Sequence, residues 1–148
     1  MSLNKANIYF IGIGGIGMSA LARYFNQSGN KVAGYDRSTT ILTKQLQKEG
    51  ISITDFYEAD AIPHPYRDSE NTLVIYTPAV AADNPMLAYF KEEGFECLKR
   101  AEVLGLISRE MKTIAVAGTH GKTTVSSMIA YLLKVGGIKV NGFLGGIS

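Results

Sequence analysis

Residues 10–19 read Phe-Ile-Gly-Ile-Gly-Gly-Ile-Gly-Met-Ser and carry the pattern G-x-G-x-x-G at Gly12, Gly14 and Gly17. The apolar run 7–11 before the glycines predicts a buried parallel strand. Apolar residues at helical spacing follow, from Met18 to Phe25. This strand–turn–helix context is the one in which the pattern binds a diphosphate, since Gly12 permits the tight turn, Gly14 lets a backbone approach phosphates, and Gly17 lets helix and strand pack closely.

A carboxylate follows the second apolar segment, at Asp36 after residues 31–35. It lies about 20 residues beyond the loop, where an acidic side chain commonly accepts from ribose hydroxyls. These features do not distinguish a dinucleotide from another nucleoside diphosphate. Because Arg37 could meet a 2′-phosphate, an NAD(P)-binding oxidoreductase or redox sensor is one interpretation, and a non-catalytic nucleotide-binding module is another. The structural alternative is that the glycines form only a tight turn and Asp36 caps a helix or is solvated.

A second glycine loop lies at residues 118–124, Gly-Thr-His-Gly-Lys-Thr-Thr. It matches the end of G-x-x-x-x-G-K-[ST], but Val116 stands where the first glycine would fall, so the loop is a shortened variant. Backbone N–H groups of such a loop form a nest for phosphate oxygens. Lys122 can reach the β- and γ-phosphates, and the Thr123 hydroxyl can ligate Mg²⁺. His120 either shapes the loop or contacts phosphate.

The alternation of apolar strands and amphipathic helices predicts the α/β class with parallel sheets. Further strands are expected at 51–53, 73–76 and 95–98, with a helix that Asn84-Pro85 begins and a loop at 55–71. The pattern restarts at the second loop, so we expect two units, 1–110 and 111–148. The second would hold strands at 113–117 and 139–144 around a helix. Since this is too little to cover a sheet, we expect the sequence to stop inside its second domain.

Composition narrows the class of partner. The formal net charge is +2 and 46% of residues are hydrophobic, which argues against nucleic acid or an anionic membrane as a partner. One cysteine, Cys97, fits a reducing compartment. No apolar run approaches the ~20 residues that span a bilayer, and no signal peptide is evident. We therefore expect a soluble cytoplasmic protein.

The two loops, of different kinds and in this order, resemble the Mur ligases, the ATP-dependent amide-bond ligases of peptidoglycan synthesis. Arg100-Ala101-Glu102 and Asn84-Pro85 are also typical of them. The resemblance is closest to the member that joins L-alanine to UDP-N-acetylmuramate; the ligase that attaches recycled murein peptide is an alternative. It implies a Rossmann-like first domain that holds UDP-N-acetylmuramate instead of NAD. The implied UDP-sugar site comprises Gly12, Gly14, Gly15, Ile16, Gly17, Asp36, Thr77, Pro78 and Ala79.

The resemblance also implies a central domain that binds ATP and Mg²⁺ through Gly118, Thr119, His120, Gly121, Lys122, Thr123 and Thr124. Lys122 and Thr123 would act on the γ-phosphoryl group as it passes to the muramic acid carboxylate, before L-alanine attacks the acyl phosphate. Other catalytic groups of the family come later than Ser148, so we expect residues 1–148 to bind UDP-sugar without turnover. Two departures stand out: Asp55-Phe56 where many members have Gly-His, and Thr77-Pro78-Ala79 in place of Ser-Ser-Ala.

Overall fold

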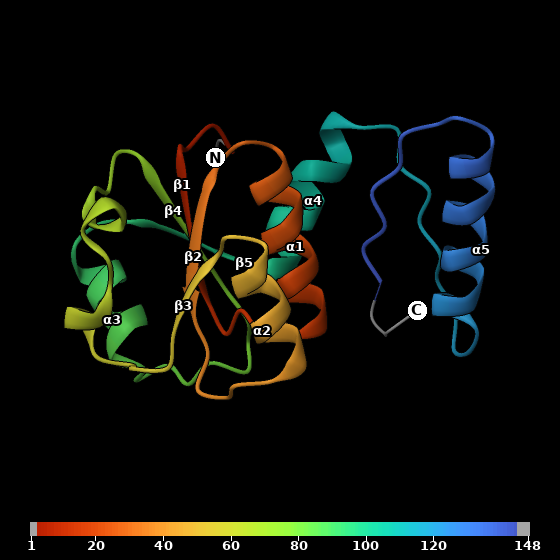
Figure 1. Ribbon diagram of the computed structural model, residues 1–148. Helices are drawn as coiled ribbons and strands as arrows, with labels where there is room; N and C mark the ends of the chain where they lie inside the picture. Colours follow the sequence, from red (N-terminus) through yellow and green to blue (C-terminus); the bar gives the residue numbers. More distant parts are fainter. Residues whose placement is uncertain (1–2, 145–148) are drawn as a thin grey trace.

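A five-stranded, all-parallel sheet forms the centre of the computed structural model, which describes residues 3–144 (Figure 1). The strand order is β3-β2-β1-β4-β5. This confirms the predicted α/β class and the Rossmann-like first domain. The elements run β1 (Asn7–Ile11), α1 (Ile16–Gln27), β2 (Lys31–Tyr35), α2 (Ile41–Lys48), β3 (Ser52–Thr54), η1 (Ala59–Ala61), η2 (His64–Arg67), β4 (Thr72–Tyr76), α3 (Pro85–Glu92), β5 (Glu96–Lys99), α4 (Arg100–Glu110) and α5 (Lys122–Val135).

Strand β1 is buried on both faces, because helices cover the sheet from both sides (Figure 1). Its even-numbered residues, Ile8 and Phe10, pack with apolar side chains of α1, α2 and α4. Tyr9 and Ile11 point to the opposite face, where α3 and the short 3₁₀ helices η1 and η2 pack. This burial on both faces explains why the sequence shows a continuous apolar run instead of an alternating one.

Local sequence signals set the helix boundaries. Asn84 caps α3, and its side-chain oxygen accepts from the N–H groups of Met86 and Leu87 at 3.0 and 3.2 Å. The prediction of this helix start is therefore confirmed. Gly29 follows α1 with a φ of +92°, a backbone conformation that favours glycine. Strand β3 begins one residue later than predicted, at Ser52.

The segment after α4 differs from the sequence-based expectation. Helix α5 is present, and Figure 1 shows it beside the sheet domain, but neither 113–117 nor 139–144 forms a strand. Among the described residues, no backbone hydrogen bond ties either segment to a neighbouring strand. A strand exists by pairing, so apolar β-branched residues without a partner remain extended chain. The prediction of strands at these two segments was wrong for this chain.

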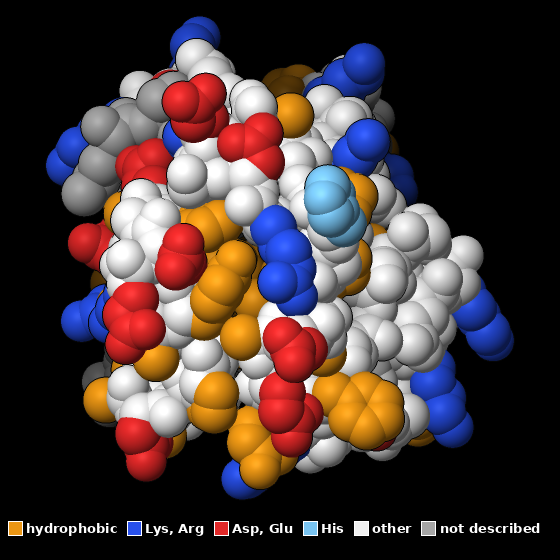
Figure 2. Space-filling model, turned by 90° about the vertical axis from the view of Figure 1, so that its left-hand side faces the viewer, with side chains coloured by type: hydrophobic (Ala, Val, Ile, Leu, Met, Phe, Trp, Pro, Cys, Tyr) orange, Lys and Arg blue, Asp and Glu red, His pale blue; other side chains and the backbone are white. Residues whose placement is uncertain are grey.

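No residue of helix α5 is fully buried, and hydrophobic residues such as Met128 and Leu132 are 60% and 65% exposed. A ring contact joins the end of this segment to the sheet domain, with the Phe143 and Tyr24 centroids 5.7 Å apart. On the face of the molecule seen in Figure 2, acidic and basic side chains are interspersed with small hydrophobic patches. Between residues 3 and 144, no helix has the length and hydropathy needed to cross a membrane.

Candidate functional site

The first glycine loop lies at the carboxyl end of β1, next to β2 on one side and β4 on the other. Chain connections reverse direction between β1 and β4, and ligands of open α/β sheets bind at such switch points. The carbonyl of Tyr35 at the end of β2 accepts from the N–H groups of Gly12 and Ile13 at 2.8 and 3.0 Å. Gly12 has a φ of +87°, and a Cβ there would lie 2.9 Å from Cγ2 of Thr77. Glycine is therefore required at this turn.

Asp36 binds the loop directly. Its Oδ2 accepts from the Gly14 N–H at 2.8 Å, and its Oδ1 accepts from the Ser38 N–H at 2.9 Å. A Cβ on Gly14 would lie 2.7 Å from Oδ2 of Asp36 and 2.9 Å from Cγ2 of Thr43. The side chain is half-buried at the end of β2. Asp36 follows the end of β2, as the sequence indicated, and its carboxylate holds the backbone of the loop.

The first turn of α1 offers free backbone donors. Ser19 is the first residue whose N–H donates to a carbonyl of this turn, that of Gly15 at 2.8 Å. The N–H groups of Ile16, Gly17 and Met18 therefore have no acceptor within the helix. Gly15 is the N-cap and contributes no side-chain cap. The helix therefore presents N–H groups and the positive end of its dipole to whatever lies in front of the loop.

A cavity of about 580 Å³ opens in front of these donors. Its volume falls within the range of sites that hold small molecules and cofactors. Four strand ends contribute to it, so residues far apart in sequence line one space. They are Gly12, Gly15, Gly17, Met18, Tyr35, Asp36, Arg37, Thr77, Ala79, Val80, Ala81, Asn84 and Arg100.

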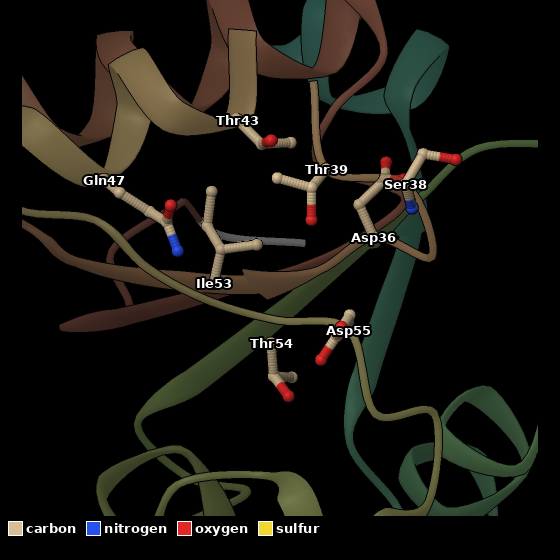
Figure 3. Close-up of a pocket in the computed structure, with 8 residues that line it drawn as sticks. All are labelled: Asp36, Ser38, Thr39, Thr43, Gln47, Ile53, Thr54 and Asp55. Carbon is tan, nitrogen blue, oxygen red and sulfur yellow. The ribbon is translucent and has the colours of Figure 1, made fainter. Parts of the chain in front are cut away.

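A smaller pocket of about 180 Å³ adjoins Asp36 on its other side. Figure 3 shows Thr43 and Gln47 of α2 near Ile53 of β3, with Asp36 and Asp55 toward one end of the pocket. Ser38, Thr39 and Thr54 complete the lining. Hydroxyl, amide and carboxylate groups dominate this pocket, so it can exchange several hydrogen bonds with a polar ring or sugar. Asp36 lines both cavities.

Most of the predicted UDP-sugar residues come together around the larger cavity. Gly12, Gly15, Gly17, Asp36, Thr77 and Ala79 line it. Gly14 lies behind Asp36, while Ile16 and Pro78 are exposed and outside the lining. Sequence reasoning gave no site role to Arg100, Asn84 or Val80. These residues follow β4 and β5 in the sequence. Since parallel sheets bind ligands at the carboxyl ends of their strands, that position could have identified them as candidates.

One tyrosine in the lining has a shifted acidity. Burial, and secondly the negative charge of Asp36, raise the pKa of Tyr35 above its usual value. This shift keeps the phenol protonated to a higher pH than that of a free tyrosine.

The second loop has phosphate-binding geometry of its own. Gly118 and Gly121 have φ angles of +152° and +76°, and Gly121 is the N-cap of α5 without a side-chain cap. The Lys122 ammonium donates to the Gly118 carbonyl at 2.6 Å, so the lysine folds back over the loop. Thr123 is half-buried in the first turn. The start of this helix thus combines free N–H groups, a lysine and a hydroxyl. These are the groups that can bind the phosphates of a nucleoside triphosphate.

The described residues 3–144 contain no group of three or more His, Cys, Asp or Glu side chains placed to hold a metal. The resemblance to the Mur ligases implies that the Thr123 hydroxyl ligates a metal here, and Thr123 lies in the first turn of α5. Such a site fits Mg²⁺, which commonly keeps several waters and takes the rest of its shell from phosphates.

Comparison with known proteins adds to this geometry. The model of the Mur ligase family, catalytic domain, matches residues 7–112. UDP-N-acetylmuramate–L-alanine ligase of Christiangramia forsetii is 51% identical over 143 residues, which cover 96% of this chain and 32% of that protein. The same enzyme of Flavobacterium johnsoniae is 52% identical over 148 residues, covering 99% of this chain and 33% of the relative.

Solved structures agree with the sequence relatives. The UDP-N-acetylmuramate–alanine ligase of Thermotoga maritima superimposes with a TM-score of 0.84 and 40% identity, covering 96% of this chain and 32% of that one. A UDP-N-acetylmuramate:L-alanyl-gamma-D-glutamyl-meso-diaminopimelate ligase from Neisseria meningitides gives a TM-score of 0.79 at 25% identity, over 90% of this chain and 40% of the other. The chain spans about a third of the length of the curated relatives it matches.

Proposed function

The chain belongs to the Mur ligase family, and on that premise we propose that it is the UDP-sugar-binding part of an ATP-dependent ligase that joins L-alanine to UDP-N-acetylmuramate in peptidoglycan synthesis. One observation carries the substrate assignment. The cavity of about 580 Å³ brings the free donors of the glycine loop, Asp36 and the Thr77 turn to one switch point. An elongated nucleotide sugar has a diphosphate in its middle and polar groups at both ends, which suits this arrangement.

In this proposal the diphosphate lies against the first turn of α1, at Gly15, Ile16 and Gly17. Their N–H groups and the helix dipole stabilise negative charge there. The uridine end points toward Asp36 and the polar pocket between α2 and β3. The turn Thr77-Pro78-Ala79 forms the opposite wall, with Gly12 and Gly14 shaping the loop. Asp55 lines the small pocket at the position where many family members place Gly-His.

Residues 118–124 would bind ATP, in a second domain that begins at residue 111 after a first domain of residues 1–110. Gly118, Thr119, His120, Gly121 and Thr124 would form the cradle, Lys122 would neutralise charge on the transferred phosphoryl group, and Thr123 would ligate Mg²⁺. Magnesium would supply a further positive charge to the phosphates.

The transfer to the muramic acid carboxylate and the attack by L-alanine need groups that the longer relatives carry, so the 148-residue chain is expected to bind without ligating. Because ATP is available in the cytoplasm, we propose that the protein acts there.

The test is a calorimetric titration of the chain with UDP-N-acetylmuramate, and separately with NADH and NADPH. Saturable binding of the UDP-sugar, with neither nicotinamide nucleotide binding, is the expected result. Arg37 lines the cavity beside Asp36, which is the feature that favours the rival NAD(P) site. Binding of NADH or NADPH without the UDP-sugar would overturn the proposal in favour of an oxidoreductase or redox sensor.

The ATP site is tested by Lys122→Met. This variant keeps the apolar stem and removes the charge, so it should lower ATP affinity and leave UDP-sugar affinity unchanged. Lys134→Met is the matched control, because Lys134 lies in the last turn of the same helix. Equal ATP affinity in the wild type and Lys122→Met would remove the lysine from the site. Turnover of L-alanine, ATP and UDP-sugar to phosphate by the 148-residue chain would contradict the expectation of binding without ligation.

A further inference from the structure

Arg100, the first residue of α4, lies against the glycine loop although it is 83 positions from Gly17 along the chain. A Cβ added to Gly17 would collide with Nη1 of the guanidinium, and would lie 3.0 Å from Cζ and 3.2 Å from Cδ. The side chain therefore runs along the first turn of α1. Gly17 is needed because it makes room for this arginine.

The guanidinium of Arg100 has no partner among the residues that the structure describes. Within residues 3–144 it forms neither an ion pair nor a hydrogen bond, although it is half-buried and lines the large cavity. The other half-buried arginines of the described residues are paired: Arg67 donates to two backbone carbonyls, and Arg23 pairs with Glu49 at 3.0 Å. Arg37 and Arg109 are exposed to solvent. A partly desolvated cation beside the positive end of a helix is unfavourable unless an anion joins them.

The acid nearest to Arg100 in the sequence of α4 contacts the backbone instead of the guanidinium. Glu102 stands two positions later, but its Oε2 accepts from the Lys99 N–H at 2.7 Å and so closes the start of α4. The carboxylate fixes the backbone that carries Arg100 while leaving the guanidinium without a counter-ion. The Arg100-Ala101-Glu102 segment thus aims one cation into the cavity and anchors it with the neighbouring acid.

We propose that Arg100 binds the diphosphate of the nucleotide sugar, clamping it between the guanidinium and the free N–H groups of the first turn of α1. This inference rests on the proposed function and adds a specificity-determining residue to that site. A planar guanidinium can donate two parallel hydrogen bonds to phosphate oxygens and adds a full positive charge, which a backbone nest does not carry. Arg100 accordingly selects ligands that carry the diphosphate over ligands that share only the uridine.

The experiment compares Arg100→Ala, Arg100→Gln and Arg100→Lys with the wild type. Dissociation constants for UDP-N-acetylmuramate, UDP and uridine are measured by NMR titration of the whole 148-residue chain. Arg100→Ala and Arg100→Gln are expected to weaken UDP-N-acetylmuramate and UDP by about 10- to 100-fold, since a charge-assisted contact is lost, and to leave uridine unchanged. Arg100→Lys should recover part of the affinity. Arg109→Ala, an exposed arginine in the last turn of α4, is the matched control and should bind as the wild type does.

A double-mutant cycle with Gly17→Ala gives a second readout that does not depend on one variant folding well. When Arg100 is present, the methyl group of Gly17→Ala displaces the guanidinium and should weaken UDP binding. In the Arg100→Ala background the obstacle is gone, so Gly17→Ala should cost little more. Equal losses for Gly17→Ala in both backgrounds would overturn the inference.

The outcomes separate this inference from the proposed function. If the wild type binds UDP-N-acetylmuramate and both neutral variants bind it equally well, Arg100 has no role and the function stands. A uniform loss across UDP and uridine would assign Arg100 a structural role and also overturn the inference. If the wild type binds no UDP ligand at all, the proposed function itself fails.

Discussion

The carboxylate of Asp36 accepts a hydrogen bond from the backbone N–H of Gly14 at 2.8 Å, and this contact ties the end of β2 to the glycine loop after β1. The same carboxylate accepts from Ser38 at 2.9 Å, so it also orders the chain that leads into α2. Since Asp36 lines both cavities, its position sets their shape as well as the conformation of the loop.

Asp36→Ala should destabilise the protein, because it leaves the Gly14 and Ser38 N–H groups without their acceptor. Loss of a partly buried acceptor typically costs about 1–3 kcal/mol of unfolding free energy. Asp36→Asn keeps an oxygen for one of the two bonds and should cost less. Urea denaturation followed by circular dichroism measures both. Equal stability of the wild type and Asp36→Ala would mean that water replaces the carboxylate without loss.

Gly14→Ala should destabilise the fold by about 1–3 kcal/mol through overpacking. The new Cβ would lie 2.7 Å from Oδ2 of Asp36 and 2.9 Å from Cγ2 of Thr43. Neither neighbour moves easily, because Asp36 makes two hydrogen bonds and Thr43 is buried within the capping box of α2. The variant should also bind UDP-N-acetylmuramate more weakly, as measured by calorimetry.

The matched control is the same substitution at Gly105. That glycine lies inside α4, and a Cβ there meets no atom within 4 Å. Gly105→Ala should therefore stabilise the protein by about 0.5–1 kcal/mol, since alanine loses less backbone entropy in a helix. The opposite signs at Gly14 and Gly105 are the prediction, and destabilisation at both positions would contradict the steric explanation.

Asn84→Ala should lower the unfolding free energy by about 1 kcal/mol, the usual effect of losing an N-cap. The side chain accepts from two N–H groups at the start of α3, and alanine supplies no acceptor. Asn84→Asp retains the cap and serves as control. Since Asn84 also lines the large cavity, a ligand-affinity change shared by both variants would indicate a contact beyond capping.

Cys97 should react slowly with thiol reagents at pH 8. Burial raises the pKa of its thiol from 9.0 to about 11, so little thiolate forms in the folded state. Because the folded pKa is the higher one, this thiol's contribution to stability is fully present below pH 9 and is lost as the pH rises toward 11. The measurements are the rate of modification in buffer and in urea, and the pH dependence of stability compared with Cys97→Ala. Equal rates in buffer and urea would show that the thiol is accessible.

Much of the first unit could be predicted from local patterns. The strands β1, β2 and β4 coincide with continuous apolar runs, and Asn84-Pro85 marks the start of α3. The same reasoning was wrong for 113–117 and 139–144, which have strand composition but no paired neighbour. The residue types of a segment indicate how well it would fit into a sheet. A strand also requires an adjacent strand with free backbone groups.

The sequence by itself determined where the glycines, the strands and most helices lie, because these depend on periodicity, caps and turns within a few residues of one another. It also placed Asp36 at the end of β2. The tertiary structure alone decided that Asp36 bonds to Gly14, that Arg100 lies over Gly17, and that Arg100 has no counter-ion between residues 3 and 144. These relationships depend on the strand order β3-β2-β1-β4-β5 and on the register of the sheet, which bring distant strand ends to one edge and are not encoded by local spacing.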